Sequence, residues 1–73
     1  MSKLSQNEIV GRVLAAEANG LYTVELENGN RVLAHVATET RLTVGRIIPG
    51  VGVVLELSPY DLSRGRIIRR REG

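Results

Sequence analysis

The sequence contains no cysteine, phenylalanine or tryptophan, and its only aromatic residues are two tyrosines. Without cysteine the chain can form neither a disulfide nor a thiolate metal site, a composition that suits a reducing compartment such as the cytoplasm. A single histidine, His35, is present, whereas a zinc site normally needs three or four clustered ligands. The sequence therefore predicts a protein that uses no metal or other cofactor.

Long apolar runs are also missing. A membrane-spanning helix needs about 20 consecutive apolar residues, and residues 1–8 are polar and lack the apolar segment of a signal peptide. We therefore expect a cytoplasmic protein without membrane contact. The length of 73 residues suits one small domain, expected to be monomeric, with flexible termini at residues 1–7 and 71–73.

The residues of an enzyme active site are scarce. The eight glycines are spread along the chain as turn residues and form no phosphate-binding loop. Glu25 and Glu27 resemble a catalytic carboxylate pair, but residues two apart on a strand share a face without any catalytic role. Ser63 has no histidine near it in the sequence that could activate it. These features predict a protein that is not an enzyme.

Positive charge is concentrated in the second half of the chain. Residues 1–39 carry three basic and five acidic side chains, a net charge of −2, whereas residues 40–73 carry seven basic and three acidic ones, a net charge of +4. Every basic residue except Lys3 is arginine, which makes two-point contacts with phosphate. This asymmetry indicates an anionic partner on one side of the molecule and favours nucleic acid.

Apolar and polar residues mostly alternate, which predicts β-strands. The expected strands cover Ile9–Ala16, Leu21–Glu27, 31–36, 53–57 and a last segment around Ile67 and Ile68. Gly11 lies inside the first strand and predicts a bulge or sharp bend there. Asn19-Gly20 predicts a turn, and Asn28-Gly29 predicts a hairpin in which both residues take positive φ.

The alternation stops at residues 37–48, where Thr38–Leu42 could form a short helix capped by Thr38 or an ordered loop. Five strands with a short helix or loop between the third and fourth favour an all-β fold, a five-stranded oligonucleotide/oligosaccharide-binding (OB-fold) barrel. Closure of the barrel would remove exposed strand edges. An SH3-like barrel is the nearest alternative, but it would lack the insertion after the third strand.

Several residues are candidates for binding RNA. His35 is expected on the outer face of the third strand, which such barrels use for oligonucleotides. Tyr60 either packs its ring over the barrel mouth or leaves it available to a base or sugar. Arg64 and Arg66 flank Gly65 and should point to one face, and Asp61 should bond to the amides of the turn. The full candidate set is Arg46, Arg64, Arg66, Arg41, His35, Tyr60 and Arg69.

The remaining basic residues near the end of the chain, Arg70 and Arg71, fit a terminal tail equally well. Rows of aromatic side chains, on which general single-strand binders rely, are absent. Recognition should therefore depend on the charge and shape of a folded RNA.

Four segments carry a family resemblance that extends without gaps from about Gly11 to Arg70. They are Val24–Gly29, Ala34-His35, Arg46-Ile47 and Glu56–Ile67, the last containing Pro-Tyr-Asp-Leu-Ser-Arg-Gly-Arg. Together they resemble bacterial translation initiation factor 1. The resemblance implies an S1-like OB-fold that binds the aminoacyl-tRNA site of the small ribosomal subunit, against ribosomal RNA and a ribosomal protein of the decoding region. It also implies partnership with initiation factors 2 and 3 and a role in start-site selection.

The sequence departs from this family at two places. Thr38–Leu42 stands where the family usually carries the basic segment Gly-Lys-Met-Arg-Lys, and only Arg41 is retained. Val51 and Gly52 replace the usual Asp-Lys pair. These changes indicate a divergent, reconstructed or engineered member, with weaker affinity for RNA. The alternatives are a general RNA chaperone resembling a cold-shock protein, or a protein adapter or scaffold in which RNA binding is weakened.

Overall fold

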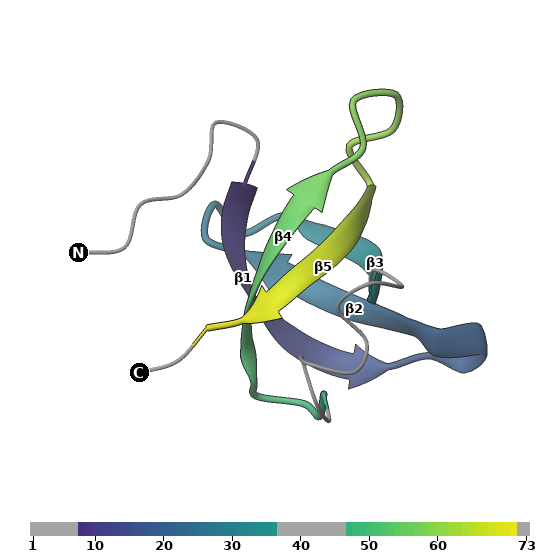
Figure 1. The fold of residues 1–73 in the computed structure, drawn as a ribbon, viewed down its shortest axis with the longest axis vertical. Helices are drawn as coiled ribbons and strands as arrows, with labels where there is room; N and C mark the ends of the chain where they lie inside the picture. The colour runs from purple at the N-terminus through teal and green to yellow at the C-terminus, as the bar shows by residue number, and fades with distance from the viewer. Residues whose placement is uncertain (1–7, 37–46, 72–73) are drawn as a thin grey trace.

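Five β-strands close into a barrel in the computed structural model, which describes residues 8–36 and 47–71 (Figure 1). The strands are β1 (Glu8–Ala16), β2 (Leu21–Leu26), β3 (Arg31–Val36), β4 (Gly52–Leu57) and β5 (Arg64–Arg70), and a short 3-10 turn, η1, covers Ala18–Gly20. The expected all-β barrel is therefore confirmed. The expected helix or loop at Thr38–Leu42 lies outside the described residues.

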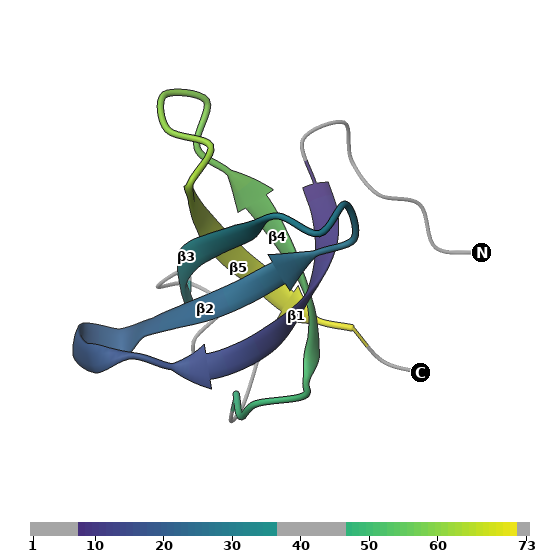
Figure 2. The ribbon, with the colours of Figure 1, turned by 180° about the vertical axis from the view of Figure 1, so that it is seen from behind.

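The order of strands around the barrel is β1-β2-β3-β5-β4. All neighbouring pairs run antiparallel except β3 and β5, which are parallel. β1 curves along the barrel and pairs on both sides, so that Gly11 lies opposite Leu26 of β2 and opposite Val53 of β4 (Figures 1 and 2). The described strands therefore leave no unpaired sheet edge, which protects this small barrel against edge-to-edge association.

The core lies inside the barrel and consists almost entirely of β-branched and other aliphatic side chains. Its largest fully buried members are Leu55, Ile67, Val13, Val24 and Val53. Tyr22, Val36 and Leu57 are half-buried and pack against this cluster. On β3 the buried residues Val32 and Ala34 alternate with exposed Arg31 and His35, which confirms the outer position expected for His35.

Gly11 does not mark a bulge, so that part of the expectation is wrong. The register of β1 against β2 shifts between Val13 and Ala15, which places the irregularity at Leu14. A Cβ atom on Gly11 would lie 2.5 Å from Val24 Cγ1 and 3.0 Å from the carbonyl oxygen of Glu25. Glycine is required here because β1 and the side chains of β2 approach closely inside the barrel.

The turn predicted at Asn19-Gly20 is confirmed, whereas the β2–β3 turn differs from the expectation. Asn19 and Gly20 both take positive φ, of 63° and 74°, as a tight turn between β1 and β2 requires. In the β2–β3 turn only Gly29 does so, with φ of 90°, and the expectation for Asn28 is wrong. β2 already ends at Leu26, and the Asn28 side chain accepts a hydrogen bond from the Asn30 N–H.

The chain ends fall partly outside the described residues, so the flexible termini stay a prediction for residues 1–7 and 72–73. Arg71, which is expected in the C-terminal tail, donates its backbone N–H to the Gly52 carbonyl at 2.8 Å. Within residues 8–36 and 47–71, no helix has the length and apolar character needed to cross a membrane.

Candidate nucleic-acid interface

The parallel pairing of β3 with β5 brings together residues that are about 30 positions apart in the sequence. Leu33 lies opposite Arg64, and His35 lies opposite Arg66. Residues opposite each other on neighbouring strands share one face of the sheet. The exposed side chains of Arg64 and Arg66 alternate with buried Gly65 and Ile67, so both arginines point outward beside His35, as predicted from their spacing.

These side chains border a groove with a volume of about 420 Å³ on the outside of the barrel. Its apolar part is formed by Leu21, Leu33 and Leu57. Its polar part is formed by His35, Glu56, Ser58, Arg64 and Arg66, and Pro59 and Gly65 complete the lining. An apolar surface edged by two guanidinium groups can hold a base or sugar while the arginines contact phosphate.

Arg66 has a carboxylate partner in this groove. Its Nη2 lies 2.5 Å from Oε1 of Glu56, which is the residue opposite it on β4. The two side chains are 47% and 32% exposed, so solvent screens the pair and it contributes about 1 kcal/mol or less to stability. Glu56 therefore competes with an incoming phosphate for Arg66 without holding the arginine firmly.

Arg69 is also paired, but at a different place on the barrel. Its Nη2 lies 3.3 Å from Oε1 of Glu8 on β1. Since β4 runs between β1 and β5, this bridge spans the outside of β4, where Val54 lies opposite Val10 on one side and Arg69 on the other. Val54 is only 4% exposed although, unlike Val53 and Leu55, it does not belong to the core cluster, which is consistent with cover by the bridging side chains.

The β4–β5 loop projects from one end of the barrel (Figure 1) and begins at the groove, where Ser58 and Pro59 line it. The loop is closed by a hydrogen bond from the Ser58 N–H to the Arg64 carbonyl at 2.9 Å. Asp61 accepts hydrogen bonds from both the backbone N–H and the hydroxyl of Ser63. Its expected role as the organising residue of this turn is confirmed.

These hydrogen bonds lower the pKa of the Asp61 carboxyl below its ordinary value. The Ser63 hydroxyl has the largest effect, followed by the Ser63 N–H, and the Arg64 guanidinium adds a smaller Coulombic contribution. Asp61 is thus ionised at neutral pH and links the conformation of the loop to the strand that carries Arg64.

Tyr60 lies at the tip of this loop and is 96% exposed. The structure therefore rules out the interpretation in which its ring packs over the barrel mouth. Leu62, two residues further, is 67% exposed. An exposed aromatic ring and an exposed leucine on one projecting loop form an apolar tip next to the groove, available to a base, a sugar or a protein surface.

The structure brings three of the predicted site residues together at the groove, namely His35, Arg64 and Arg66. Tyr60 lies on the adjoining loop, and Arg69 lies further along β5 against Glu8. The remaining two, Arg41 and Arg46, lie outside the described residues. A binding role for all seven residues stays a prediction.

Sequence reasoning missed the apolar surface of Leu21 and Leu33 and the pairing of Glu56 with Arg66. The alternation predicts that Glu56 points outward, but its pairing with Arg66 depends on which strands are neighbours in the barrel. The Glu56–Arg66 pair follows from the pairing of β4 with β5, and the position of Leu21 beside His35 follows from the pairing of β2 with β3.

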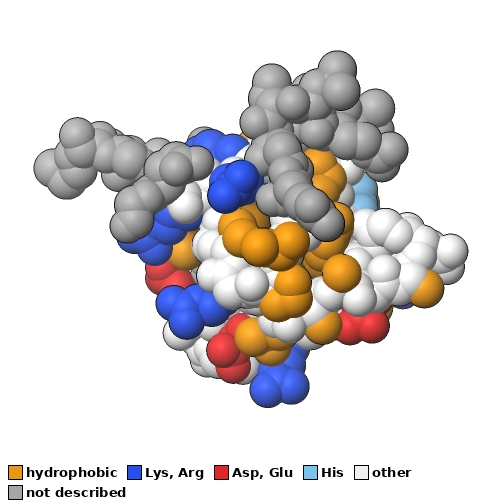
Figure 3. Space-filling view, turned by 90° about the horizontal axis from the view of Figure 1, so that it is seen from below, with side chains coloured by type: hydrophobic (Ala, Val, Ile, Leu, Met, Phe, Trp, Pro, Cys, Tyr) orange, Lys and Arg blue, Asp and Glu red, His pale blue; other side chains and the backbone are white. Residues whose placement is uncertain are grey.

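Charge is not uniform elsewhere on the surface. On the face shown in Figure 3, hydrophobic side chains occupy the middle, and basic and acidic side chains both lie around the margin. Among the described residues, no group of three or more histidine, aspartate or glutamate side chains is placed to hold a metal ion.

The closed five-stranded barrel, with its basic and apolar groove on β3 and β5, defines an OB-fold of the kind that binds oligonucleotides. A family model described as "Translation initiation factor 1A / IF-1" matches residues 1–72. The chain therefore belongs to the translation initiation factor 1A / IF-1 family, and it is a translation initiation factor. Proteins of this class are generally not enzymes, and the absence of catalytic activity in this chain stays a prediction.

Solved structures support this assignment. The solution structure of translation initiation factor 1 from the Wolbachia endosymbiont strain TRS of Brugia malayi shares 36% sequence identity with this chain, with a TM-score of 0.72. That match covers 97% of this chain and 86% of the other. YjeQ from Thermotoga maritima is 27% identical, with a TM-score of 0.70, over 89% of this chain but 23% of its own. A similar barrel thus also occurs within a larger protein.

Proposed function

We propose that this factor binds the aminoacyl-tRNA site of the small ribosomal subunit and assists start-site selection together with initiation factors 2 and 3. Its contacts would be with ribosomal RNA and a ribosomal protein of the decoding region. Membership of the initiation factor family and the groove at His35, Arg64 and Arg66 support this proposal. A role on the ribosome would place the protein, as a monomer, in the cytoplasm.

The groove suggests how RNA is held. Arg64 and Arg66 contact phosphates and set the orientation of the barrel, since their guanidinium groups match phosphate oxygens in two-point geometry. His35 and the apolar surface of Leu33 receive a base or sugar between them. Tyr60, on the projecting loop, adds a stacking surface.

Binding of RNA requires Arg66 to exchange Glu56 for a phosphate. The nearby carboxylate lowers the affinity of any RNA whose phosphate does not reach Arg66. In such a complex Glu56 repels the RNA backbone, and no Arg66–phosphate contact offsets this repulsion. This arrangement favours a folded RNA of fixed phosphate positions over a flexible single strand. The factor would act by occupying its site: the bound barrel fills the site and shifts the equilibrium between conformations of the subunit.

The proposal is tested by measuring binding to purified small ribosomal subunits over a range of salt concentrations. Arg64→Ala combined with Arg66→Ala should weaken binding by tenfold or more and reduce the log–log salt slope by roughly 0.7–0.9 for each lost phosphate contact. Arg31→Ala is the matched control, because Arg31 is exposed at the start of β3 and does not line the groove. Unchanged affinity and slope in the double variant would reject the groove as the RNA site.

Competition experiments separate this function from its alternatives. Displacement by an authentic initiation factor 1 would show that both proteins use one site on the subunit. Equal affinity for unstructured RNA and for subunits would instead indicate a general RNA chaperone of the cold-shock type. A folded protein that does not bind subunits at low salt would contradict the proposed function and point to an adapter or scaffold.

A further inference from the structure

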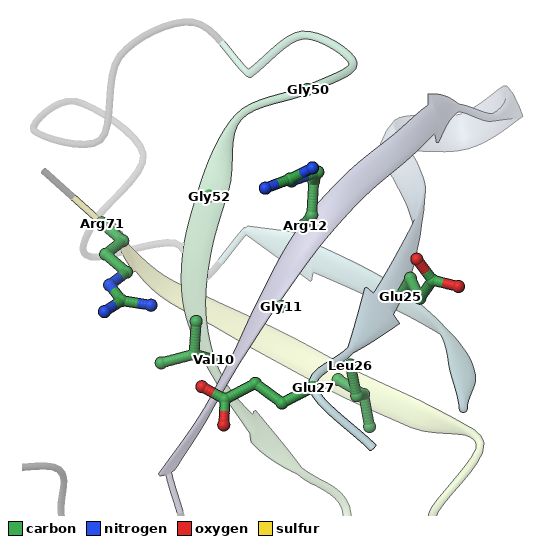
Figure 4. A pocket seen from close by; sticks show the side chains of 9 residues that line it. All are labelled: Val10, Gly11, Arg12, Glu25, Leu26, Glu27, Gly50, Gly52 and Arg71. Atoms are coloured by element: carbon green, nitrogen blue, oxygen red, sulfur yellow. The ribbon is translucent and has the colours of Figure 1, made fainter. Parts of the chain in front are cut away.

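A second groove, of about 490 Å³, lies on the outside of the barrel over β1, β2 and β4 (Figure 4). Its charged residues are Arg12, Glu25, Glu27 and Arg71. It shares no lining residue with the groove on β3 and β5. The two grooves are therefore distinct surfaces of the barrel.

The strand register explains how these charges come together. Arg12 of β1 lies opposite Glu25 of β2 on one side and opposite Gly52 of β4 on the other. Arg71 follows β5 and donates its backbone N–H to the Gly52 carbonyl at 2.8 Å. The Glu27 N–H reaches the Val10 carbonyl at 3.3 Å, which holds Glu27 beside β1.

The side chains are arranged around a gap at Gly52. Figure 4 shows the Arg12 side chain extending from β1 toward β4, and Arg71 lying on the other side of β4. In the same view Val10 lies between Arg71 and Glu27, and Glu25 is directed away to the far side. Guanidinium groups thus lie on both sides of the glycine, and a carboxylate lies close to the apolar Val10.

Neither the core nor the backbone requires a glycine at position 52. A Cβ atom there would meet only Arg71 Cβ at 3.5 Å and the Gly11 carbonyl at 3.9 Å, which are ordinary contacts. Gly52 is also absent from the residues with positive φ, which among the described glycines are Gly20, Gly29 and Gly50. A side chain at position 52 would instead fill the floor of the groove, since Gly52 lines it.

The charged side chains of this groove are not paired with one another or with other described residues. None of Arg12, Arg71, Glu25 and Glu27 has an ion pair or side-chain hydrogen bond with another described residue, whereas Arg66 and Arg69 are both paired with carboxylates. Two guanidinium groups and two carboxylates with no net charge give little attraction for a polyphosphate chain, and the carboxylates would repel it. They complement a segment that itself carries both signs of charge.

We infer that the groove at Gly52 binds an extended polypeptide segment of a partner protein. The segment would place an acidic side chain between Arg12 and Arg71 and a basic side chain against Glu27. Its backbone would lie close to β4 because Gly52 has no side chain. The strands beneath are fully paired with each other, so the segment binds through side chains and does not extend the sheet.

The test is a titration of the isotope-labelled full-length protein, followed by amide chemical shifts. The probe is a short peptide with one aspartate near one end, one lysine near the other, and glycine and valine between them, used in both sequence orders. At concentrations up to a few millimolar, at least one order should shift the amides of Arg12, Glu27, Gly52 and Arg71. All-acidic and all-basic peptides of equal length should bind at least about threefold more weakly.

Gly52→Val provides the decisive variant, because it fills the floor of the groove and favours a strand conformation. It should weaken binding of the mixed-charge peptide by tenfold or more while the melting temperature stays the same or rises. Glu27→Gln combined with Arg12→Gln should also weaken binding, which provides a second variant if Gly52→Val alters the fold.

Three outcomes would overturn the inference. The first is that neither mixed-charge peptide shifts these amides, and the second is that the peptides bind equally well to folded Gly52→Val. The third is that a short oligouridylate shifts the same amides more strongly than the peptides, which would make the groove a nucleic-acid site. None of these outcomes bears on binding of the β3–β5 groove to ribosomal subunits.

Discussion

Glu56 on β4 and Arg66 on β5 lie directly opposite each other and form an ion pair on the outer face of the barrel. The same row of the sheet continues to Glu8 on one side and His35 on the other. Four ionisable side chains therefore cross four neighbouring strands, with the carboxylates at one end and the basic groups at the other. RNA that contacts His35 and Arg66 would meet the two carboxylates at the border of its binding surface.

Removing the charge of Glu56 should strengthen RNA binding. In Glu56→Gln the carboxylate that faces Arg66 becomes neutral, so a phosphate no longer competes with it. An exposed pair of this kind is worth about 0.2–1 kcal/mol, so affinity for small subunits should rise by a factor of about 1.4 to 5. Binding isotherms at low and moderate salt would measure the change, with Glu25→Gln, outside this groove, as the control. Weaker binding by Glu56→Gln would show that Glu56 positions Arg66 for RNA.

The glycines at positions 11 and 52 should respond oppositely to alanine. In Gly11→Ala the new Cβ collides with Val24 Cγ1 and the Glu25 carbonyl, and overpacking of this kind costs typically 1–3 kcal/mol. In Gly52→Ala the Cβ meets only ordinary contacts, so the free energy of unfolding should stay the same or rise by about 0.4–1 kcal/mol. Urea unfolding of both variants measures the difference. Equal destabilisation would contradict the close approach of β1 to β2.

The β4–β5 loop should loosen in acid. The pKa of Asp61 is lower in the folded protein than its ordinary value of 3.8, so its contribution is fully present above that value. The contribution is lost as the pH falls through the lower folded-state pKa. Amide exchange of Ser63 should therefore accelerate below about pH 4 beyond the intrinsic pH dependence. Asp61→Asn should exchange faster at neutral pH and show no such step; an identical acid profile in the variant would assign the effect to another group.

Tyr60 should matter for binding and not for folding. Because its ring is almost fully exposed, Tyr60→Ala should change the free energy of unfolding by less than about 0.5 kcal/mol. If a base stacks on the ring, the same change should weaken binding to small subunits by about 1–3 kcal/mol. Leu62→Ala, at another exposed position of the loop, separates stacking from a general apolar contact. Equal losses in both variants would indicate that the loop tip contacts protein.

The local pattern of the sequence contained most of the strand information. Alternation correctly placed His35 on the outer face of Arg31–Val36 and put Arg64 and Arg66 on one face, because in a barrel each strand has one buried and one exposed face. The prediction failed where a contact from another strand decided the outcome. The space at position 11 is limited by Val24 of β2, which the sequence of β1 alone does not show.

The candidate site could be predicted only in part from the sequence, because its assembly also depends on contacts between strands. Arg64, Arg66 and His35 could be selected one at a time, from composition, from spacing and from a family resemblance. Their assembly into one groove depends on the parallel β3–β5 contact, which no local pattern encodes. The mixed-charge groove at Gly52 likewise joins residues from both ends of the chain. Gly52 indicates a binding groove only when the structure shows that there is space for a side chain at this position.

The β3–β5 contact also determines when the groove can exist during synthesis of the chain. β3 ends at Val36, but its parallel neighbour does not begin until Arg64, so a nascent chain that has already formed the β1–β3 meander still lacks Arg64 and Arg66. The last strand completes both the barrel wall and the cationic half of the groove. On the proposed function, a chain truncated before Arg64 would therefore not bind RNA through this surface.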